Sequence, residues 1–471
     1  MTLSAQPSFS PPVAPVSWHV RRTVTLALPI IVARAALVVM FTVDTIMAGH
    51  LGAQPLAQFG LGVAPQLTLM LIAVGALQAT AVLVSQAVGA GDMPRIGTIF
   101  RASVVHALLL AVAILLLSLG AGAFFRAIGH APDLVEGAAR VSFAFGLGMP
   151  GTLLFIVCNL FMEATGRPKT GMAIMLLANL VNVPLNLALG SGWGDVIPAL
   201  GAEGIMLASS IARTGAGLTL AAILLIQALR IDTFHILSFG KRAVADGRLL
   251  TGPVAARLRR LGLPMGLAQG IESAAFAAVV MMAGLIGTAQ LAAYQTTMTL
   301  VTLTFMMAIG TAGATAIRVG RAVGEGRAAE AARAGWVGIG LGTLWPVPVA
   351  IAFVVAPEQV ASLVIADPRT VAAAREALFV AAFLLSVDAG MGVALGALRG
   401  LGDVWWPTAW QIAAFWLVGI PVAWAGGLMF DLGAGGLIGG LLAGIVVSLA
   451  GLLLRFRRQV ARHAERPGDA R

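Results

Sequence analysis

Long apolar runs alternate with short polar stretches along almost the whole chain. A bilayer core needs roughly 20 apolar residues of helix to cross it. The runs are continuous and rich in Leu and Ala, whereas the strands of a membrane barrel would alternate over about ten residues. The pattern therefore predicts an all-α integral membrane protein. The 12 expected transmembrane helices cover residues 24–43, 60–84, 102–125, 138–161, 171–190, 204–228, 261–285, 291–315, 334–356, 374–398, 407–428 and 434–455.

The second half of the chain repeats the first. A shift of 235 residues places Met47-Ala48-Gly49 on Met282-Ala283-Gly284, and Ala87-Val88-Gly89 on Ala322-Val323-Gly324. One register held over so long a stretch indicates a duplication. Six helices per half is an even number, so both halves begin on the same side of the membrane. We therefore expect two six-helix lobes related by a pseudo-twofold axis along the membrane normal.

The longest polar connection, Leu229 to Arg260, divides the two halves and holds seven basic residues, Lys241 and Arg242 among them. The expected organisation is a disordered N-terminal tail at 1–20, an N-lobe at 21–229, a cytoplasmic basic linker at 230–260, a C-lobe at 261–456 and a cytoplasmic C-terminal tail at 457–471.

Composition and charge agree with a membrane protein. The chain is 59% hydrophobic and 11% charged, with a mean hydropathy of +0.94, whereas soluble domains carry about 25% charged residues. If the N-terminus is cytoplasmic, 24 of the 30 Lys and Arg residues fall on the inside. This bias predicts that both termini are cytoplasmic and explains the +10 balance better than nucleic-acid binding does. We expect a monomer whose macromolecular surroundings are membrane lipid, with no nucleic-acid partner.

The residues that would support catalysis are scattered. The single thiol, Cys158, cannot form an intramolecular disulfide. The histidines have no metal-ligand spacing, and no nucleophile–base pair or phosphate-binding Gly-rich loop is present. We therefore predict no enzymatic activity, no metal site and no cofactor.

Three carboxylates fall in or at the end of apolar runs: Asp44, Glu272 and Asp388. An ionisable group at mid-membrane costs at least about 2.5 to 3.5 kcal/mol, so it needs a reason to be there. A desolvated carboxyl takes up a proton more readily, and carboxylate oxygens also hold hard cations. Ion coupling is the predicted role, against a structural buried pair for Glu272 and Asp388 and a solvated interfacial group for Asp44.

The fifth apolar run contains Asn179, Asn182 and Asn186. Asn182 and Asn186 are four residues apart and share a helix face. Pro184 between them removes a backbone donor and can free a carbonyl oxygen. These residues are candidates for a polar site, or for hydrogen bonds that join helices.

Arg34 and Arg213 lie near the middles of the first and sixth runs. A guanidinium cannot be neutralised there, so each must meet an anion, a carbonyl group or water. Arg34 is ten residues before Asp44, roughly 15 Å along a helix, which disfavours direct pairing of the two. The sequence indicates no partner for either arginine.

Several motifs together resemble one transporter family. They are Phe41-Thr-Val-Asp-Thr-Ile-Met-Ala-Gly49, Asn182-Val-Pro-Leu-Asn186, Gly270-Ile-Glu-Ser-Ala-Ala-Phe276, Ala316-Ile-Arg-Val-Gly-Arg-Ala-Val-Gly-Glu325 and Gly396-Ala-Leu-Arg-Gly-Leu-Gly-Asp403. The chain resembles the multidrug and toxic compound extrusion (MATE) family, and within it the NorM type. The resemblance implies a V-shaped pair of lobes, in a bacterial-type inner (plasma) membrane, that exports organic cations or drugs in exchange for Na+ or H+.

The resemblance also assigns the polar residues. It implies an N-lobe ion site at Asp44, Asn182 and Asn186, and a C-lobe cation site at Glu272 and Asp388.

The two intramembrane arginines depart from the family pattern. A fixed positive charge disfavours a second cation nearby, so we predict that the C-lobe pair carries the coupling. The alternatives are a lipid-linked saccharide flippase of the wider superfamily, whose members commonly have more spans, and an exporter of one specific metabolite.

Overall fold

The computed structural model describes residues 14–194, 196, 198–237, 248–362 and 368–465. Within them, 12 helices are long and apolar enough to cross a membrane, and no β-strand is present. These findings confirm the predicted all-α fold and its number of spans. Residues 1–13, 238–247 and 466–471 of the predicted tails and linker lie outside the described residues, and with them Lys241 and Arg242.

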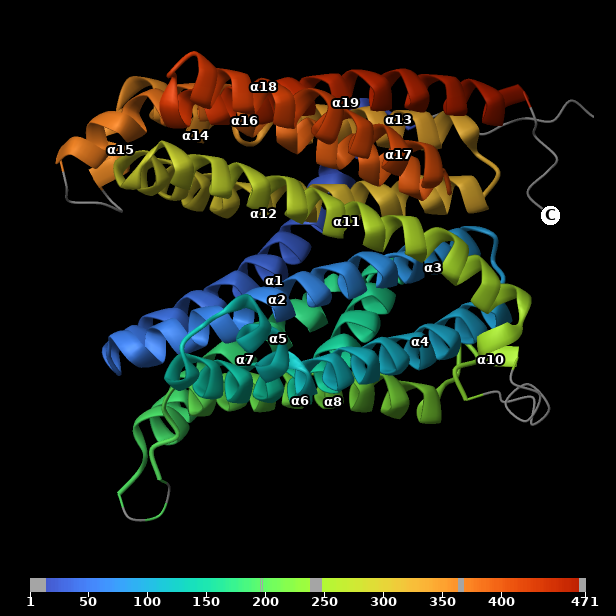
Figure 1. Ribbon diagram of the computed structural model, residues 1–471. Helices are drawn as coiled ribbons and strands as arrows, with labels where there is room; N and C mark the ends of the chain where they lie inside the picture. The colour runs from blue at the N-terminus through green and yellow to red at the C-terminus, as the bar shows by residue number, and fades with distance from the viewer. Residues whose placement is uncertain (1–13, 195, 197, 238–247, 363–367, 466–471) are drawn as a thin grey trace, which may run out of the picture.

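The N-lobe is coloured blue to green in Figure 1. Its second span consists of two helices, α2 and α3, which meet at Gln78. Its elements are α1 (Val16–His50), α2 (Ala53–Leu77), α3 (Ala79–Gly89), α4 (Met93–Leu119), α5 (Ala121–Ile128), α6 (Pro132–Ala164), α7 (Pro168–Asn186), a π-helical segment (Leu187–Ser191) and α8 (Gly201–Arg230).

The C-lobe forms the second layer of helices, yellow to red in Figure 1. Its elements are α10 (Arg248–Thr251), α11 (Pro253–Ile286), α12 (Thr288–Gly324), α13 (Ala328–Leu344), α14 (Val347–Val355), α15 (Pro357–Ser362), α16 (Pro368–Gly400), α17 (Trp405–Ala413), a π-helical segment (Ala414–Gly419), α18 (Ile420–Trp424), a second π-helical segment (Ala425–Met429) and α19 (Gly433–Glu465).

Several helices are longer than the apolar runs that predicted them. Helix α1 begins at Val16, inside the predicted tail, α11 begins at Pro253, inside the predicted linker, and α19 continues to Glu465. Arg and His side chains lay their apolar stems along a helix while their polar heads reach water, so the helix continues where the apolar run stops. The third predicted span, 102–125, instead crosses a break, because α4 ends before Gly120 and α5 follows it.

Each lobe buries its own apolar core. Phe145, Met149 and Phe161 are among the largest buried side chains of the N-lobe, and Phe415 and Phe456 are among those of the C-lobe. The N-lobe core also takes in residues from α11 and α12, so the two lobes share an apolar contact. The shared residues are Leu258, Leu261, Met265, Ala314 and Ile317.

The lobes touch backbone to backbone near the ends of α3 and α12. A Cβ atom at Gly89 would lie 2.1 Å from the carbonyl oxygen of Arg321, and one at Gly324 would lie 2.0 Å from that of Gln86. The 235-residue shift converts the first contact into the second, since Gly89 corresponds to Gly324 and Gln86 to Arg321. The duplicated halves therefore meet around a pseudo-twofold axis. We call this end of the molecule, where α1 begins and α19 ends, the terminal end.

Hydrogen bonds also connect the two lobes toward the terminal end. Arg399 Nη1 donates to Gln78 Oε1 at 2.7 Å, and Gln86 Nε2 donates to the carbonyl oxygen of Gly400 at 3.0 Å. The terminal halves of the two lobes are therefore held together.

Candidate ion-coupling sites

In the N-lobe, α1, α7 and α8 bring a carboxylate and three polar side chains together. Asp44 Oδ1 accepts a hydrogen bond of 2.8 Å from Asn186 Nδ2, and Asp44 Oδ2 accepts one from Ser209 Oγ. Asn182 Nδ2 donates to Ser209 Oγ at 2.8 Å. All four side chains are buried. The structure thus brings together Asp44, Asn182 and Asn186, and it adds Ser209, which the sequence did not single out.

Asn179 does not join this cluster. Its amide donates to the carbonyl oxygen of Met175 at 2.9 Å, one turn back in its own helix. The helix changes to π geometry at Leu187, three residues after Pro184. A proline removes one helical hydrogen bond, and π-helical turns often mark functional sites.

Arg213 lies beside the Asp44 cluster and is 4% exposed. Its Nε donates to the carbonyl oxygen of Ser209 at 3.1 Å. The guanidinium lies 4.9 Å from the ring centroid of Phe41 and 5.4 Å from that of Phe145. The negative charge of Asp44 also acts on it. Arg213 therefore has a backbone, an aromatic and an anionic partner in the N-lobe core.

Arg34 has a carboxylate partner that sequence reasoning missed. Its Nη2 lies 3.8 Å from Glu163 Oε1, which also accepts a hydrogen bond of 2.6 Å from Asn159 Nδ2. Glu163 is 2% exposed. The fourth predicted span ends at 161 and leaves Glu163 in a loop, whereas α6 continues to Ala164. The available signal was Arg34 itself, since a buried guanidinium requires an anion.

In the C-lobe, α11, α16 and α17 contribute Glu272, Asp388 and Gln411. Gln411 Nε2 donates to Glu272 Oε2 at 3.1 Å, and the charge of Glu272 acts on Asp388. Asp388 is 5% exposed, whereas Glu272 is partly accessible. Asp388 Oδ1 and Gln411 Oε1 are buried and accept no hydrogen bond from the described residues. An acid with an unsatisfied buried oxygen, beside a second acid and an unsatisfied amide oxygen, fits a proton or a hard cation.

A family model matches this chain twice, over residues 29–188 and 264–425. It is the model of the family described as MatE, and the starts of its two matches differ by the 235-residue repeat. The chain belongs to the MatE family. The first MatE match contains Arg34, Asp44 and Asn186, and the second contains Glu272 and Asp388.

Curated relatives and solved structures agree with this family. The chain is 32% identical to a protein named "Probable multidrug resistance protein NorM" of Caulobacter vibrioides, covering 95% of this chain and 93% of that one. A protein of the same name from Pseudomonas aeruginosa is also 32% identical, with 93% and 89% coverage. The MatE fold matches "Crystal structure of MATE in the bent conformation" with a TM-score of 0.85 at 19% identity, covering 97% of this chain and 100% of that one. A match with "Outward-facing conformation of a multidrug resistance MATE family transporter of the MOP superfamily" has a TM-score of 0.84 at 20% identity and covers 96% and 99%. The resemblance to NorM-type MATE transporters is confirmed.

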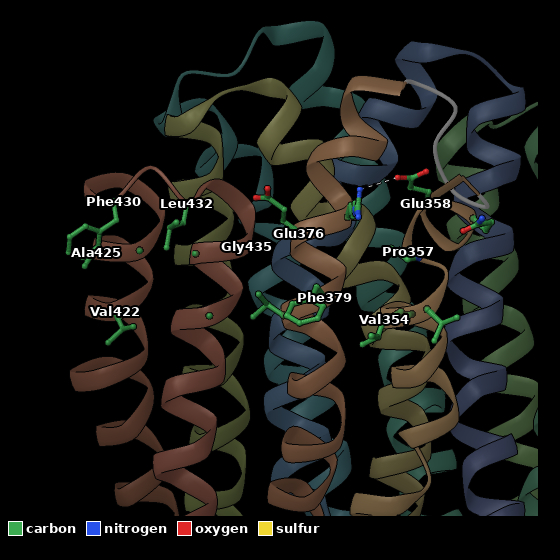
Figure 2. A pocket seen from close by; sticks show the side chains of 18 residues that line it. Val354, Pro357, Glu358, Glu376, Phe379, Val422, Ala425, Phe430, Leu432 and Gly435 are labelled. Atoms are coloured by element: carbon green, nitrogen blue, oxygen red, sulfur yellow. Dashed lines mark hydrogen bonds and ion pairs between the residues drawn. The ribbon is translucent and has the colours of Figure 1, made fainter.

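A large cavity of this MatE protein lies away from the carboxylates described above. It has a volume of about 1190 Å³ and lies at the end of the C-lobe opposite the terminal end, between α14–α16 and α18–α19. Figure 2 shows Phe379, Val354 and Phe430 on its walls and Glu358 on its rim, where Arg375 Nη1 lies 3.5 Å from Glu358 Oε1. None of the predicted coupling residues lines it.

Proposed function

We propose that this MatE protein exports small organic cations or amphipathic drugs from a bacterial cell by antiport against Na+ or H+. The names of its relatives and its fold support drug efflux. The excess of Lys and Arg on one side supports an inner-membrane orientation with both termini in the cytoplasm. The terminal end is then the cytoplasmic end.

The C-lobe acids Glu272 and Asp388 carry the coupling in this proposal. The observation behind it is a desolvated carboxylate, Asp388, with a bare buried oxygen beside a second acid. Two nearby anions in a medium of low dielectric repel each other, so a proton or Na+ between them is stabilised. The positive charge of Arg399 acts on Glu272, but two acids and one arginine still leave a net negative charge that one bound cation balances. Because Glu272 is partly accessible, an ion has a route to the pair. Binding on one side of the membrane and release on the other links ion entry to drug exit.

The pseudo-twofold arrangement supports alternating access. Contacts at the terminal end, such as Arg399 with Gln78 and Gly89 with Arg321, close the cytoplasmic side in this conformation. In the proposed cycle these contacts break when the lobes rock, and drug then enters from the cytoplasm.

Efflux from liposomes tests the proposal. Protein reconstituted with a fluorescent organic cation is given a Na+ gradient alone, then a pH gradient alone. We expect efflux with at least one gradient, and its loss in both Glu272→Gln and Asp388→Asn, which keep the side-chain shape but remove the charge. Glu136→Gln is the matched control, because the Glu136 side chain is 76% exposed and pairs only with the nearby Arg140 in the described structure. Gradient-driven efflux retained in both acid variants would refute the assignment.

A further inference from the structure

The buried charges of the N-lobe balance one another. Arg34 lies within ion-pair distance of Glu163. Arg213 and Asp44 are the remaining charges, and Asp44 is the group whose charge acts on Arg213. A buried guanidinium without an anion would be strongly unfavourable, so each arginine has one carboxylate assigned to it by position.

The hydrogen bonds around Asp44 all point toward its carboxylate. Asn186 donates to Oδ1. Asn182 donates to the oxygen of Ser209, which leaves the Ser209 hydroxyl hydrogen for Asp44 Oδ2. Both carboxylate oxygens therefore accept. These hydrogen bonds and the charge of Arg213 favour the ionised acid and oppose the desolvation that burial imposes on it.

Arg213 is held in place beside the Asp44 cluster. Its Nε is tied to the Ser209 carbonyl group, and its face lies over Phe41 and Phe145. Ser209 contacts both charges, since its hydroxyl binds Asp44 and its carbonyl group binds Arg213. Guanidinium and carboxylate are therefore fixed through one residue of α8.

We infer that Arg213 is the resident counter-cation of Asp44 and takes the electrostatic place that a coupling ion would have in the N-lobe. A proton or Na+ added at Asp44 would leave a net positive charge buried beside two aromatic rings. Asp44 and Arg213 consequently both stay ionised throughout the transport cycle, and their opposite charges cancel. Ion binding is then left to the C-lobe, where the charge of Arg399 acts on Glu272 but Asp388 has only Glu272 as a charged neighbour among the described residues. This consequence rests on the proposed function.

The protonation state of Asp44 tests this inference directly. Infrared difference spectra report protonated carboxyl groups. We compare the full chain in lipid nanodiscs at about pH 8 and at about pH 5; even the lower pH lies above the ordinary pKa range of an exposed Asp. We expect wild-type protein and Asp44→Asn to give the same carboxyl band. A band present in the wild type and lost in Asp44→Asn would overturn the inference.

Removal of the guanidinium gives the complementary result. In Arg213→Gln we expect a new carboxyl band on acidification, or one additional 22Na+ bound per chain at high pH, and neither in the Arg213→Gln/Asp44→Asn double variant. Arg213→Lys keeps the charge and is the matched control, which should behave as the wild type does. If neither probe distinguishes Arg213→Gln from the double variant, Arg213 does not exclude ions from Asp44.

Thermal unfolding of the Arg213 and Asp44 variants gives a second measurement, which applies even where a variant folds poorly. Each single substitution leaves one buried charge without its partner, so the double variant should lose less stability than the two singles added together. Additive losses would mean that the two charges are not partners. Asp388→Asn separates this inference from the proposed function, since unchanged efflux there would reject C-lobe coupling without altering the Asp44 spectra.

Discussion

Arg34 and Glu163 form an ion pair in the N-lobe, and its contribution to stability requires both side chains. Their atoms are 3.8 Å apart, and Asn159 supplies a second donor to the carboxylate. Gly171 makes room for this arrangement, because a Cβ there would lie 1.7 Å from Asn159 Oδ1. The pair joins α1 to α6 inside the N-lobe.

Glu163→Gln is predicted to destabilise the N-lobe, because it leaves the Arg34 guanidinium without its anion. Removing one partner of a buried pair costs about 3 to 5 kcal/mol. The free energy of unfolding in SDS measures the loss. The double variant Glu163→Gln/Arg34→Gln should recover part of it, and a double variant no better than Glu163→Gln alone would contradict the pairing.

Gln411→Leu is predicted to weaken ion binding without blocking transport. Gln411 donates to Glu272 but carries no charge, and loss of a hydrogen bond to a charged group costs about 1.5 to 3 kcal/mol, which is tenfold or more in affinity. The concentration of driving ion at half-maximal efflux should rise, while the maximal rate is retained. Thr408→Val on the same helix is the control, since within the described part of the chain Thr408 Oγ1 bonds only the Pro264 carbonyl group. An unchanged half-maximal concentration would exclude a role for Gln411 at the ion site.

The carboxylates and asparagines could be found from sequence because an apolar run makes each polar residue conspicuous. Glu163, Ser209 and Gln411 could not be found in the same way. Glu163 stands two residues beyond the apolar run, and neutral side chains such as Ser209 and Gln411 are common in membrane helices. Their importance arises only when folding places them against Asp44 and Glu272.

At the scale of elements, the first turns of α1 are tied to the C-lobe. Arg318 on α12 donates to the carbonyl oxygen of His19 at 2.8 Å and to His19 Nδ1 at 2.7 Å, and Glu330 Oε2 on α13 lies 3.1 Å from His19 Nε2. An arginine only donates, so Nδ1 is the unprotonated ring nitrogen. The charges of Arg327, just before α13, and of Arg333 on α13 also act on His19. The start of α1 thus closes the terminal end.

His19→Ala is predicted to loosen this closure. It removes a charge-assisted hydrogen bond and the ring near Glu330. The conformation in which the terminal end is open should therefore become about tenfold more populated. The reporter is Ser85→Cys in a Cys158→Ala background, because Ser85 is buried against Gly320 of the other lobe. Its rate of labelling by a maleimide should rise.

His50→Ala provides the matched control for that experiment. His50 ends the same helix, and among the residues that the structure describes its ring bonds only the Ile46 carbonyl oxygen. In the His50→Ala variant, the rate at which Ser85→Cys is labelled should equal that in the parent protein. Equal rates for His19→Ala and the parent would mean that this contact does not hold the lobes together.

The ends of elements were the least predictable part of the fold. The first turns of α1 hold Arg21 and Arg22, so hydropathy placed residues 16–20 in a tail although they are helical and His19 is fully buried. The burial of His19 depends on Arg318 and Glu330, which are about 300 residues away in sequence. A local pattern contains no information on such a contact.

For the whole molecule, the twelve spans and the duplication were readable from sequence, since both are repeated patterns over the full chain. The meeting of the halves adds a constraint that no single half contains. Gly89 and Gly324 are equivalent positions, and each packs against the backbone of the other lobe. Because glycine has no side chain, the backbones of the two lobes can approach each other closely at these two positions.

Gly89→Ala and Gly324→Ala are therefore predicted to have the same effect. A methyl group at either position would meet a carbonyl oxygen at 2.1 Å or 2.0 Å, and backbone cannot rotate away as a side chain can, so the lobes must separate at the terminal end. Both variants should raise labelling of Ser85→Cys and slow efflux, to extents that agree within about a factor of two, or about 0.4 kcal/mol. Gly340→Ala is the control, because a Cβ there meets nothing within 4 Å. If one of the paired variants were inactive and the other harmless, the two halves would not move as equivalent partners, and rocking about the pseudo-twofold axis would have to be replaced by movement of one lobe alone.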